Sequence, residues 1–294
     1  MTEQNQTEQF LHLIKFKDQL ITILSNSRTF AIGYHPDADG FASAAILIKY
    51  LLSNGVARKN IDLYPANTNE RVLEPAQADE VAEKQPDLLI YLDMCGHDPE
   101  QIRALKKKVG RIASIDHHRF DSKWPPLFDL YINCKFFAEL AHPEEHTTSK
   151  LMNTLFHEPQ NNWLEIAGLE GDNVVPSLPL TLSHRASSIL NQLGEIESGD
   201  EDPEIRSGRR NALLDCILLS ENLPDFVRRF EEAKKLYELY LKIEADIKDN
   251  VENLKKLEPA LEFHSSKIFT YEIMAREGYA LMNQILKGHL PFLG

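Results

Sequence analysis

A short segment near the start of the chain places one histidine and two carboxylates within a few residues of one another. The segment "YHPDADGFASAAIL" contains His35, Asp37 and Asp39, after the apolar run "TFAIGY" and before an alanine-rich helical pattern. Asp39 and Gly40 have the residue types of a helix cap, which is the ordinary role of an Asp-Gly pair. The same segment could hold a metal ion, because carboxylates and imidazoles are common ligands of divalent cations.

Two further apolar runs end in groups of the same kind. Asp93 closes "LLIYLD", and Asp116, His117 and His118 follow "RIASI". The carboxyl ends of parallel strands meet at one edge of a sheet, which is where open α/β sheets bind ligands. We therefore expect these residues to lie near one another although they are far apart in the sequence.

The chemistry of this set is that of a divalent metal site. Carboxylates with one or two imidazoles and no thiolate suit Mn²⁺ or Mg²⁺ better than structural zinc. Several carboxylates at one edge would repel one another unless cations neutralised them. Two ions about 3.5–4 Å apart would do so, would generate a hydroxide nucleophile and would stabilise the attacking and leaving oxygens of a phosphoryl group. The pattern thus indicates hydrolysis of a phosphoester or a phosphoanhydride.

The elements that must position these residues alternate between strand and helix. From Arg28 to about Asn133, short apolar runs are separated by helical patterns. This alternation predicts right-handed βαβ units, so the expected fold class is α/β, a parallel sheet flanked by helices. The candidate strands are "TFAIGY", "IDLYP", "DLLIYLD", "RIASI" and "FDLYIN".

The second half of the chain has a helical pattern. A long amphipathic helix is predicted after Asn222 and Pro224 and ends before Pro259, which suits a connector between domains; a coiled-coil dimer arm is the alternative. We expect three parts: an α/β domain at 1–195, a helical connector at 196–258, and a small, truncated C-terminal α/β subdomain at 259–294, which includes the strand "SKIFTYEI".

Composition restricts the partners of the protein. The chain has 294 residues and a net charge of −13, which argues against a protein that coats long nucleic acid but allows a small anionic ligand at a local positive site. The three cysteines form no Cys-x-x-Cys pair, so we expect buried thiols rather than zinc or redox chemistry. Without a long apolar run or a secretory signal pattern, the chain is expected to be cytoplasmic and to have no membrane partner.

Three motifs carry a resemblance to a known family. In order and spacing, "HPDADG", "LIYLD" and "SIDHH" resemble the first three motifs of the DHH phosphoesterase family, which includes RecJ-type single-strand exonucleases, nano-RNases, cyclic-dinucleotide phosphodiesterases and manganese pyrophosphatases. A fourth family motif, an Asp in a downstream helical segment, is matched by Asp172 in "IAGLEGDN". The resemblance covers residues from about 28 to 175.

The resemblance implies a role for each motif residue. It implies two Mn²⁺ ions, or Mg²⁺ in their place, with Asp93 bridging them. His118 is implied to contact the scissile phosphate and to assist proton transfer, and Asp116 to orient the neighbouring imidazole. Some family members space the first histidine three residues from the first Asp rather than one. The implied metal ligands are His35, Asp37, Asp39, Asp93, His117 and Asp172.

The substrate-binding part of the family is less well matched. Most members grip their substrate with a small C-terminal domain marked by a Gly-Gly-Gly-His run, and only "KGHLPFLG" comes near it here. Residues 259–294 are therefore expected to be the start of such a domain. Candidate phosphate-binding residues are Arg185, Arg209 and Arg210, although arginines on helical segments are more often solvated or ion-paired. His97, Asp98 and Glu170 beside the motifs are expected to be helix-start or surface groups.

The function implied by the resemblance is a manganese-dependent phosphodiesterase. It would hydrolyse single-stranded or short oligonucleotides, as exonucleases and nano-RNases do, by a two-metal mechanism. One alternative is a phosphatase or pyrophosphatase on a small phosphorylated substrate, including cyclic dinucleotides. Another is a non-catalytic replication-associated adaptor, a class that loses metal ligands; all of the expected ligand positions are present here.

Overall fold

The structure is a computed structural model, and the chain divides into two compact units, Met1–Arg229 and Phe230–Gly294. The boundaries expected near residues 195 and 258 lie outside the described part of the chain and stay predictions. The described residues are 15–66, 72–94, 98–137, 146–156, 158–172, 174, 186–191, 210, 213–232, 261–263 and 266–268.

A five-stranded parallel sheet forms the centre of the first unit, with strand order β2-β1-β3-β4-β5, which confirms the predicted α/β class. All of the candidate runs form strands. The central strands β1 and β3 are buried at every position, as expected for strands covered on both faces. The strands are β1 (Phe30–Tyr34), β2 (Ile61–Pro65), β3 (Leu88–Leu92), β4 (Arg111–Asp116) and β5 (Leu130–Asn133).

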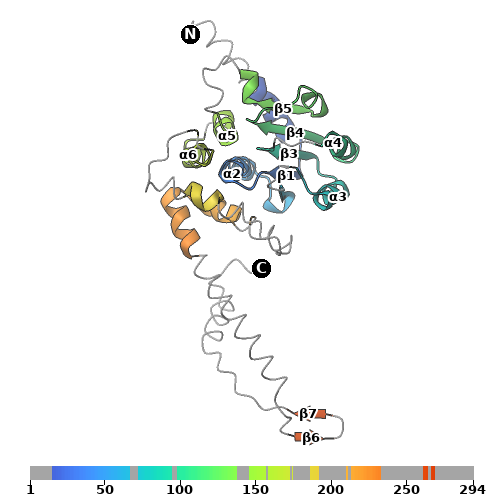
Figure 1. Ribbon diagram of the computed structural model, residues 1–294, viewed down its shortest axis with the longest axis vertical. Helices are drawn as coiled ribbons and strands as arrows, with labels where there is room; N and C mark the ends of the chain where they lie inside the picture. Colours follow the sequence, from blue (N-terminus) through green and yellow to red (C-terminus); the bar gives the residue numbers. More distant parts are fainter. Residues whose placement is uncertain are drawn as a thin grey trace. The chain divides into compact units, whose positions relative to one another are not determined.

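Helices cover both faces of this sheet (Figure 1). One face carries α2 (Ala38–Ser53), α5 (Thr148–Phe156) and α6 (Asn162–Gly171), and the other carries α3 (Pro75–Lys84) and α4 (Pro99–Leu105). The chain reverses direction across the sheet between β1 and β3, and such a switch point opens a crevice at the carboxyl ends of the strands.

Short 3-10 turns and further helical stretches complete the described part of the chain. The turns are η1 (Arg58–Asn60), η2 (Pro125–Leu127), η3 (Cys134–Phe137) and η5 (Pro159–Asn161). Residues 15–25, 186–191, 213–219 and 223–232 are also helical.

The turn between β1 and α2 is tightly packed. Asp37, not the expected pair of Asp39 and Gly40, caps α2, and its carboxylate accepts a hydrogen bond of 2.9 Å from the Gly40 N–H. A Cβ atom on Gly40 would lie 1.8 Å from the carbonyl oxygen of His35. The glycine therefore lets the helix begin directly against the loop, with Asp37 and Asp39 on either side of the helix start.

The outer edge of β2 is closed by side chains. The Arg58 guanidinium donates to the carbonyl of Ile61 at 2.8 Å, and the Gln77 amide donates to the carbonyl of Pro65 at 2.9 Å. Pro65 has no N–H to offer. A further strand would therefore find few free backbone groups along β2.

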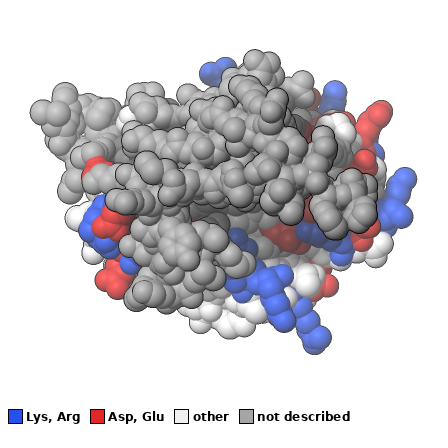
Figure 2. All heavy atoms as spheres, turned by 90° about the horizontal axis from the view of Figure 1, so that it is seen from below, with Lys and Arg blue, Asp and Glu red and all other residues white. Residues whose placement is uncertain are grey.

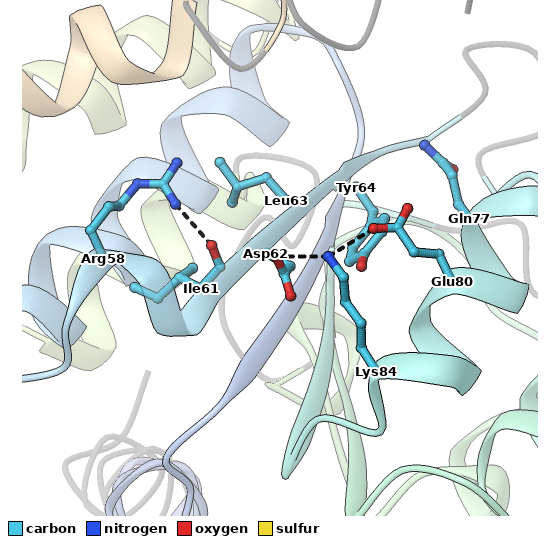
Figure 3. Close-up of a pocket in the computed structure, with 8 residues that line it drawn as sticks. All are labelled: Arg58, Ile61, Asp62, Leu63, Tyr64, Gln77, Glu80 and Lys84. Carbon is cyan, nitrogen blue, oxygen red and sulfur yellow. Dashed lines mark hydrogen bonds and ion pairs between the residues drawn. The ribbon is translucent and has the colours of Figure 1, made fainter. Parts of the chain in front are cut away.

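A cavity of about 320 Å³ lies beside this edge (Figure 3). Lys84 crosses it, with its ammonium 3.0 Å from Asp62 and 2.7 Å from Glu80. None of the predicted site residues that the structure describes lines this cavity.

The second half of the chain is described only in part. The Asn222 side chain accepts from the Asp225 N–H at 3.0 Å, as a cap does, so the predicted start of the long helix is confirmed; its course beyond residue 232 lies outside the described residues. A two-stranded antiparallel sheet pairs β6 (Leu261–Phe263) with β7 (Ser266–Ile268), and β7 lies within the predicted strand "SKIFTYEI".

Two other expectations concern the described residues directly. Cys134 is buried as expected, whereas Cys216 is only half-buried, and Cys95 lies outside the described residues. Among the helices that the structure describes, none has the length and apolar character needed to cross a membrane.

The packing at Gly40 predicts a large loss of stability on substitution. We expect Gly40→Ala to lower the free energy of unfolding by about 3 kcal/mol, because the clash is with backbone and cannot be relieved by a rotamer change. Gly55→Ala is the control: its φ is +85° in open space, so only backbone strain of about 1 kcal/mol is expected. Urea unfolding compares the two, and equal losses would contradict the proposed cause.

Candidate metal centre

Three adjacent strands deliver the predicted ligands to one edge of the sheet. Asp37 and Asp39 follow β1, Asp93 follows β3, and His117 follows β4. Their ligand atoms gather into three overlapping groups, and within each group these atoms lie within 4.8 Å of one another. The groups are His35, Asp37 and Asp93; Asp39, His117 and Asp172; and Asp93, His117 and His118.

Asp93 lies between His35, which follows β1, and His117, which follows β4. Its Oδ1 is 3.2 Å from Nε2 of His117, and its Oδ2 is 3.8 Å from Nδ1 of His35. The residue has a φ of +60°, a left-handed conformation that costs a non-glycine residue about 1–3 kcal/mol. Its N–H still donates to the carbonyl of Ile115 at 3.0 Å, so the ladder continues while the side chain turns into the site.

His35 and Asp37 form the tightest contact of the site. Nδ1 of His35 lies 2.6 Å from Oδ2 of Asp37, and both residues are buried. The one-residue spacing in the sequence therefore places imidazole and carboxylate side by side.

Asp172 reaches the site from the layer of helices rather than from the sheet. It is the C-terminal cap of α6, and its Oδ2 lies 3.1 Å from Nε2 of His117. Two glycines let α6 come this close to α2: a Cβ on Gly168 would lie 2.6 Å from Oδ1 of Asp39, and one on Gly171 would lie 2.5 Å from the Cβ of Ala38. Helix packing, rather than a strand end, therefore positions this carboxylate.

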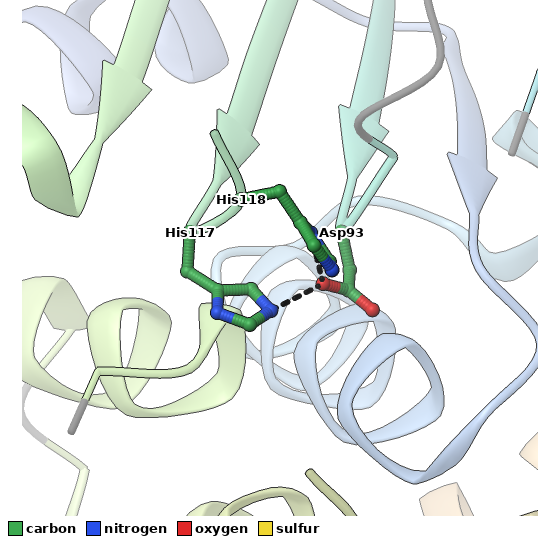
Figure 4. A group of neighbouring side chains, drawn as sticks. All are labelled: Asp93, His117 and His118. Atoms are coloured by element: carbon green, nitrogen blue, oxygen red, sulfur yellow. Dashed lines mark ion pairs between the residues drawn. The ribbon is translucent and has the colours of Figure 1, made fainter. Parts of the chain in front are cut away.

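His118 is the most exposed imidazole of the group, with 25% of its side chain accessible against 15% for His117. Its Nδ1 is 2.9 Å from Oδ1 of Asp116, which holds the ring in place. Figure 4 shows both rings directed toward Asp93. Burial would raise the pKa of Asp116, but the hydrogen bond and charge of His118 lower it overall.

The crowding of carboxylates changes their ionisation. Burial raises the pKa of Asp93 well above its ordinary value, and the nearby Asp37 and Asp39 raise it further. Burial and the charge of Asp172 likewise raise the pKa of Asp39. Burial lowers the pKa of His117, but Asp172 and Asp93 outweigh it and bring the pKa to about 12. Crowding thus favours protonation, which offsets part of the negative charge of the carboxylates.

The donor set fits a divalent cation. Among the described residues, several buried side-chain atoms at this edge have no hydrogen-bond partner, although such atoms are usually paired because leaving them unpaired is costly. Oδ2 of Asp93 and Nε2 of His35 both belong to this set, and both residues belong to one of the ligand groups. Carboxylates with imidazole and no thiolate match the preferences of Mn²⁺ and Mg²⁺.

Sequence reasoning missed the contribution of α5. The carboxylate of Asp39 accepts hydrogen bonds from the backbone N–H groups of Thr148 at 2.7 Å and Ser149 at 2.9 Å. The Thr148 hydroxyl also donates to Oδ1 of Asp93 at 3.1 Å. The sequence "TTSKLMNTLF" indicated only a helix, and the Thr and Ser at its start are ordinary for a helix end.

The remaining candidates lie elsewhere. Arg210 is buried and donates to the carbonyl of Ala66, just beyond β2, at 3.4 Å. Asp98 caps α4 by accepting from the Glu100 N–H at 2.9 Å, which confirms a helix-start role. Glu170 is buried rather than a surface group, and it accepts from the Ser187 hydroxyl at 3.3 Å. The candidates outside the described residues are His97, Arg185 and Arg209.

Comparison with known proteins agrees with this fold. Residues 29–169 match the model of the DHH family, N-terminal domain. No curated protein matches the chain. Among solved structures, the DHH domain of a protein assigned to a family of ribosomal proteins is similar, with 16% identity, a TM-score of 0.53 and coverage of 82% of this chain and 65% of that one. The exonuclease RecJ bound to manganese has 16% identity and a TM-score of 0.50 over 84% and 70% of the two chains. The chain thus spans less than two thirds of the first of these.

The raised pKa of His117 predicts how metal-free stability changes with pH. Its contribution is fully present below the unfolded pKa of about 6.5 and is lost as pH rises toward about 12, because the folded chain binds the extra proton. In EDTA, the free energy of unfolding should therefore fall between pH 6.5 and 8.5 more steeply than in His117→Gln.

Added Mn²⁺ should reverse this trend. Metal ligands must be deprotonated, so the stabilisation produced by a fixed Mn²⁺ concentration should grow as the pH rises. Urea unfolding at several pH values measures both slopes, and parallel slopes with and without Mn²⁺ would contradict the assignment of His117 to the site.

Proposed function

The chain belongs to the DHH family through residues 29–169, and on this premise we propose that it is a manganese-dependent phosphodiesterase acting on single-stranded or short oligonucleotides. The observation that carries the proposal is that two groups of ligand atoms share Asp93, with one of its oxygens facing His35 and the other facing His117. A carboxylate shared by two such groups could serve a pair of ions, the arrangement that catalyses phosphoryl transfer in many enzymes.

Each ligand has a place in this proposal. His35 and Asp37 would hold one ion, and Asp39, His117 and Asp172 the other. Asp93, which groups with His35 and Asp37 on one side and with His117 on the other, would contribute to both. Bound divalent ions in such a site activate water and stabilise the oxygens of a phosphoryl group. The protein's own part is to keep these ligands buried and fixed before substrate arrives.

His118 has a separate role. Its imidazole is the most exposed of the site histidines described above and is held by Asp116 through Nδ1. We assign it the contact with the scissile phosphate and the transfer of a proton to the leaving oxygen, which is a common task of histidine.

The charge of the protein favours a short substrate over a long nucleic-acid duplex. The chain has a net charge of −13, and Figure 2 shows acidic and basic side chains interspersed over the described part of one face. Binding to long nucleic acid needs many phosphate contacts from a basic surface. A short strand can instead be held largely through its phosphates at the metal centre.

Substitution of Asp93 tests the proposed reaction. Asp93→Asn should lower the turnover of short oligonucleotides in Mn²⁺ by at least about 100-fold, because it removes the charge shared by both ions. Asp62→Asn, which breaks the exposed ion pair with Lys84, should retain activity. Undiminished hydrolysis by Asp93→Asn would refute the proposal. Turnover of pyrophosphate, a cyclic dinucleotide or a phosphorylated nucleotide instead of oligonucleotides would favour the small-substrate alternative.

Substitution of His118 separates catalysis from metal binding. His118→Ala should reduce turnover by roughly 10²–10⁴-fold, the usual contribution of a general acid or base. Mn²⁺ binding measured by calorimetry should be largely kept, because the other ligands remain. Loss of metal binding in this variant would instead make His118 a ligand.

A further inference from the structure

We propose that Thr148 is the positioning residue that fixes the two halves of the metal centre relative to each other. The inference rests on the proposed function and extends it to a residue outside the metal-ligand set. The Thr148 backbone N–H donates to Oδ2 of Asp39 at 2.7 Å, and its hydroxyl donates to Oδ1 of Asp93 at 3.1 Å. One residue therefore binds two carboxylates that come from different strand ends.

Burial removes competition from water at these two hydrogen bonds. Thr148, Asp39 and Asp93 each have 0% exposure, so water does not compete for the carboxylate oxygens. A hydrogen bond in a buried, low-polarity place is electrostatically stronger than the same bond in water, and a buried group left without its partner is costly. Deleting the hydroxyl would remove this donor from Oδ1 of Asp93 in a place that bulk water does not reach.

The hydrogen bonds also determine which lone pairs remain for metal ions. Oδ1 of Asp93 accepts from Thr148, while Oδ2 of the same carboxylate is buried with no hydrogen-bond partner among the described residues. On Asp39, Oδ2 accepts a hydrogen bond from the Thr148 N–H and Oδ1 accepts one from the Ser149 N–H, which leaves each oxygen with a further lone pair. Each carboxylate is thus held by a donor outside the metal-ligand set, and Oδ2 of Asp93 keeps its lone pairs for a cation.

The strained backbone of Asp93 gives the hydroxyl a second role. A left-handed conformation persists only where surrounding contacts determine it, and Asp93 has a φ of +60°. The N–H bond to Ile115 holds its backbone, and the Thr148 hydroxyl, which is not a metal ligand, holds its side chain together with His117. Without the hydroxyl, Oδ1 of Asp93 would be held only by its contacts with the histidines, which are themselves proposed to act at the metal centre.

Thr148 is itself rigidly placed. It begins α5, which packs against α2 and α6, and the Thr147 and Ser149 hydroxyls beside it lie 3.0 Å apart. Gly168 of α6 leaves room for this helix start, since a Cβ there would lie 2.2 Å from the Ser149 hydroxyl. The branched side chain of Thr148 also restricts its own rotation. The Thr148 N–H and hydroxyl are therefore already in place before an ion binds, so ion binding does not have to order them.

The test compares variants that differ in one hydroxyl. Thr148→Val keeps the shape and the backbone N–H but removes the donor, whereas Thr148→Ser keeps the donor. Thr154→Val makes the same change on α5 at an exposed position, where the hydroxyl donates to the Lys150 carbonyl at 2.7 Å. Mn²⁺ affinity is measured by calorimetry on the full chain, and turnover is measured separately.

We expect Thr148→Val to bind Mn²⁺ roughly 10–100-fold more weakly than wild type, the range seen for partners that orient metal ligands. Thr148→Ser and Thr154→Val should bind as wild type does. If Thr148→Val does not fold, the contrast between Thr148→Ala and Thr148→Ser replaces it.

Two results would overturn the inference. Wild-type affinity in Thr148→Val would show that the hydroxyl does not position the ligands. Equal weakening in Thr148→Ser, which keeps the donor, would show that the loss in Thr148→Val does not come from the missing hydroxyl. Both leave the proposed function standing if wild type binds Mn²⁺ and is active. Failure of wild type itself to bind Mn²⁺ would refute the proposed function and this inference together.

Discussion

The structure depends on the close approach of several carboxylates in a space with little water. Like charges in such surroundings repel strongly, and the raised pKa values of Asp39 and Asp93 are the consequence. A fold that needed only stability would replace these groups with apolar side chains. Here the helices hold them in place instead: α5 presents N–H groups to Asp39, and α6 delivers Asp172. The site is therefore a region where stability is given up to keep carboxylates and imidazoles together, in groups that could hold a metal ion.

The order of the strands makes this arrangement possible. β1, β3 and β4 are neighbours in the sheet, so the side chains that follow them meet without long loops. Helix α2, rich in small residues, lies close to the sheet and leaves room for α5 and α6 to complete the site from the other side. Sheet and helices thus each contribute a part of the ligand set, and neither layer forms the site alone.

Sequence reasoning was successful where a local pattern carries the information. The strand-ending positions of Asp93 and His117 could be recognised because buried parallel strands are continuous apolar runs and their ends share an edge. Asp37 as the helix cap was not predicted, because Asp37 and Asp39 have the same chemistry and only the backbone distinguishes them. Thr148 could not be found at all, since its role depends on how α5 packs more than fifty residues away from Asp93. The half-buried state of Cys216 likewise follows from tertiary packing alone.

The closed edge of β2 limits how copies of this chain can associate. A parallel sheet with an open outer strand is a template on which other chains add strands, which leads to uncontrolled aggregation. Arg58 and Gln77 already donate to two carbonyls of β2, and Pro65 has no N–H to offer. The sheet therefore ends at β2, and a neighbouring chain finds little backbone there on which to add a strand.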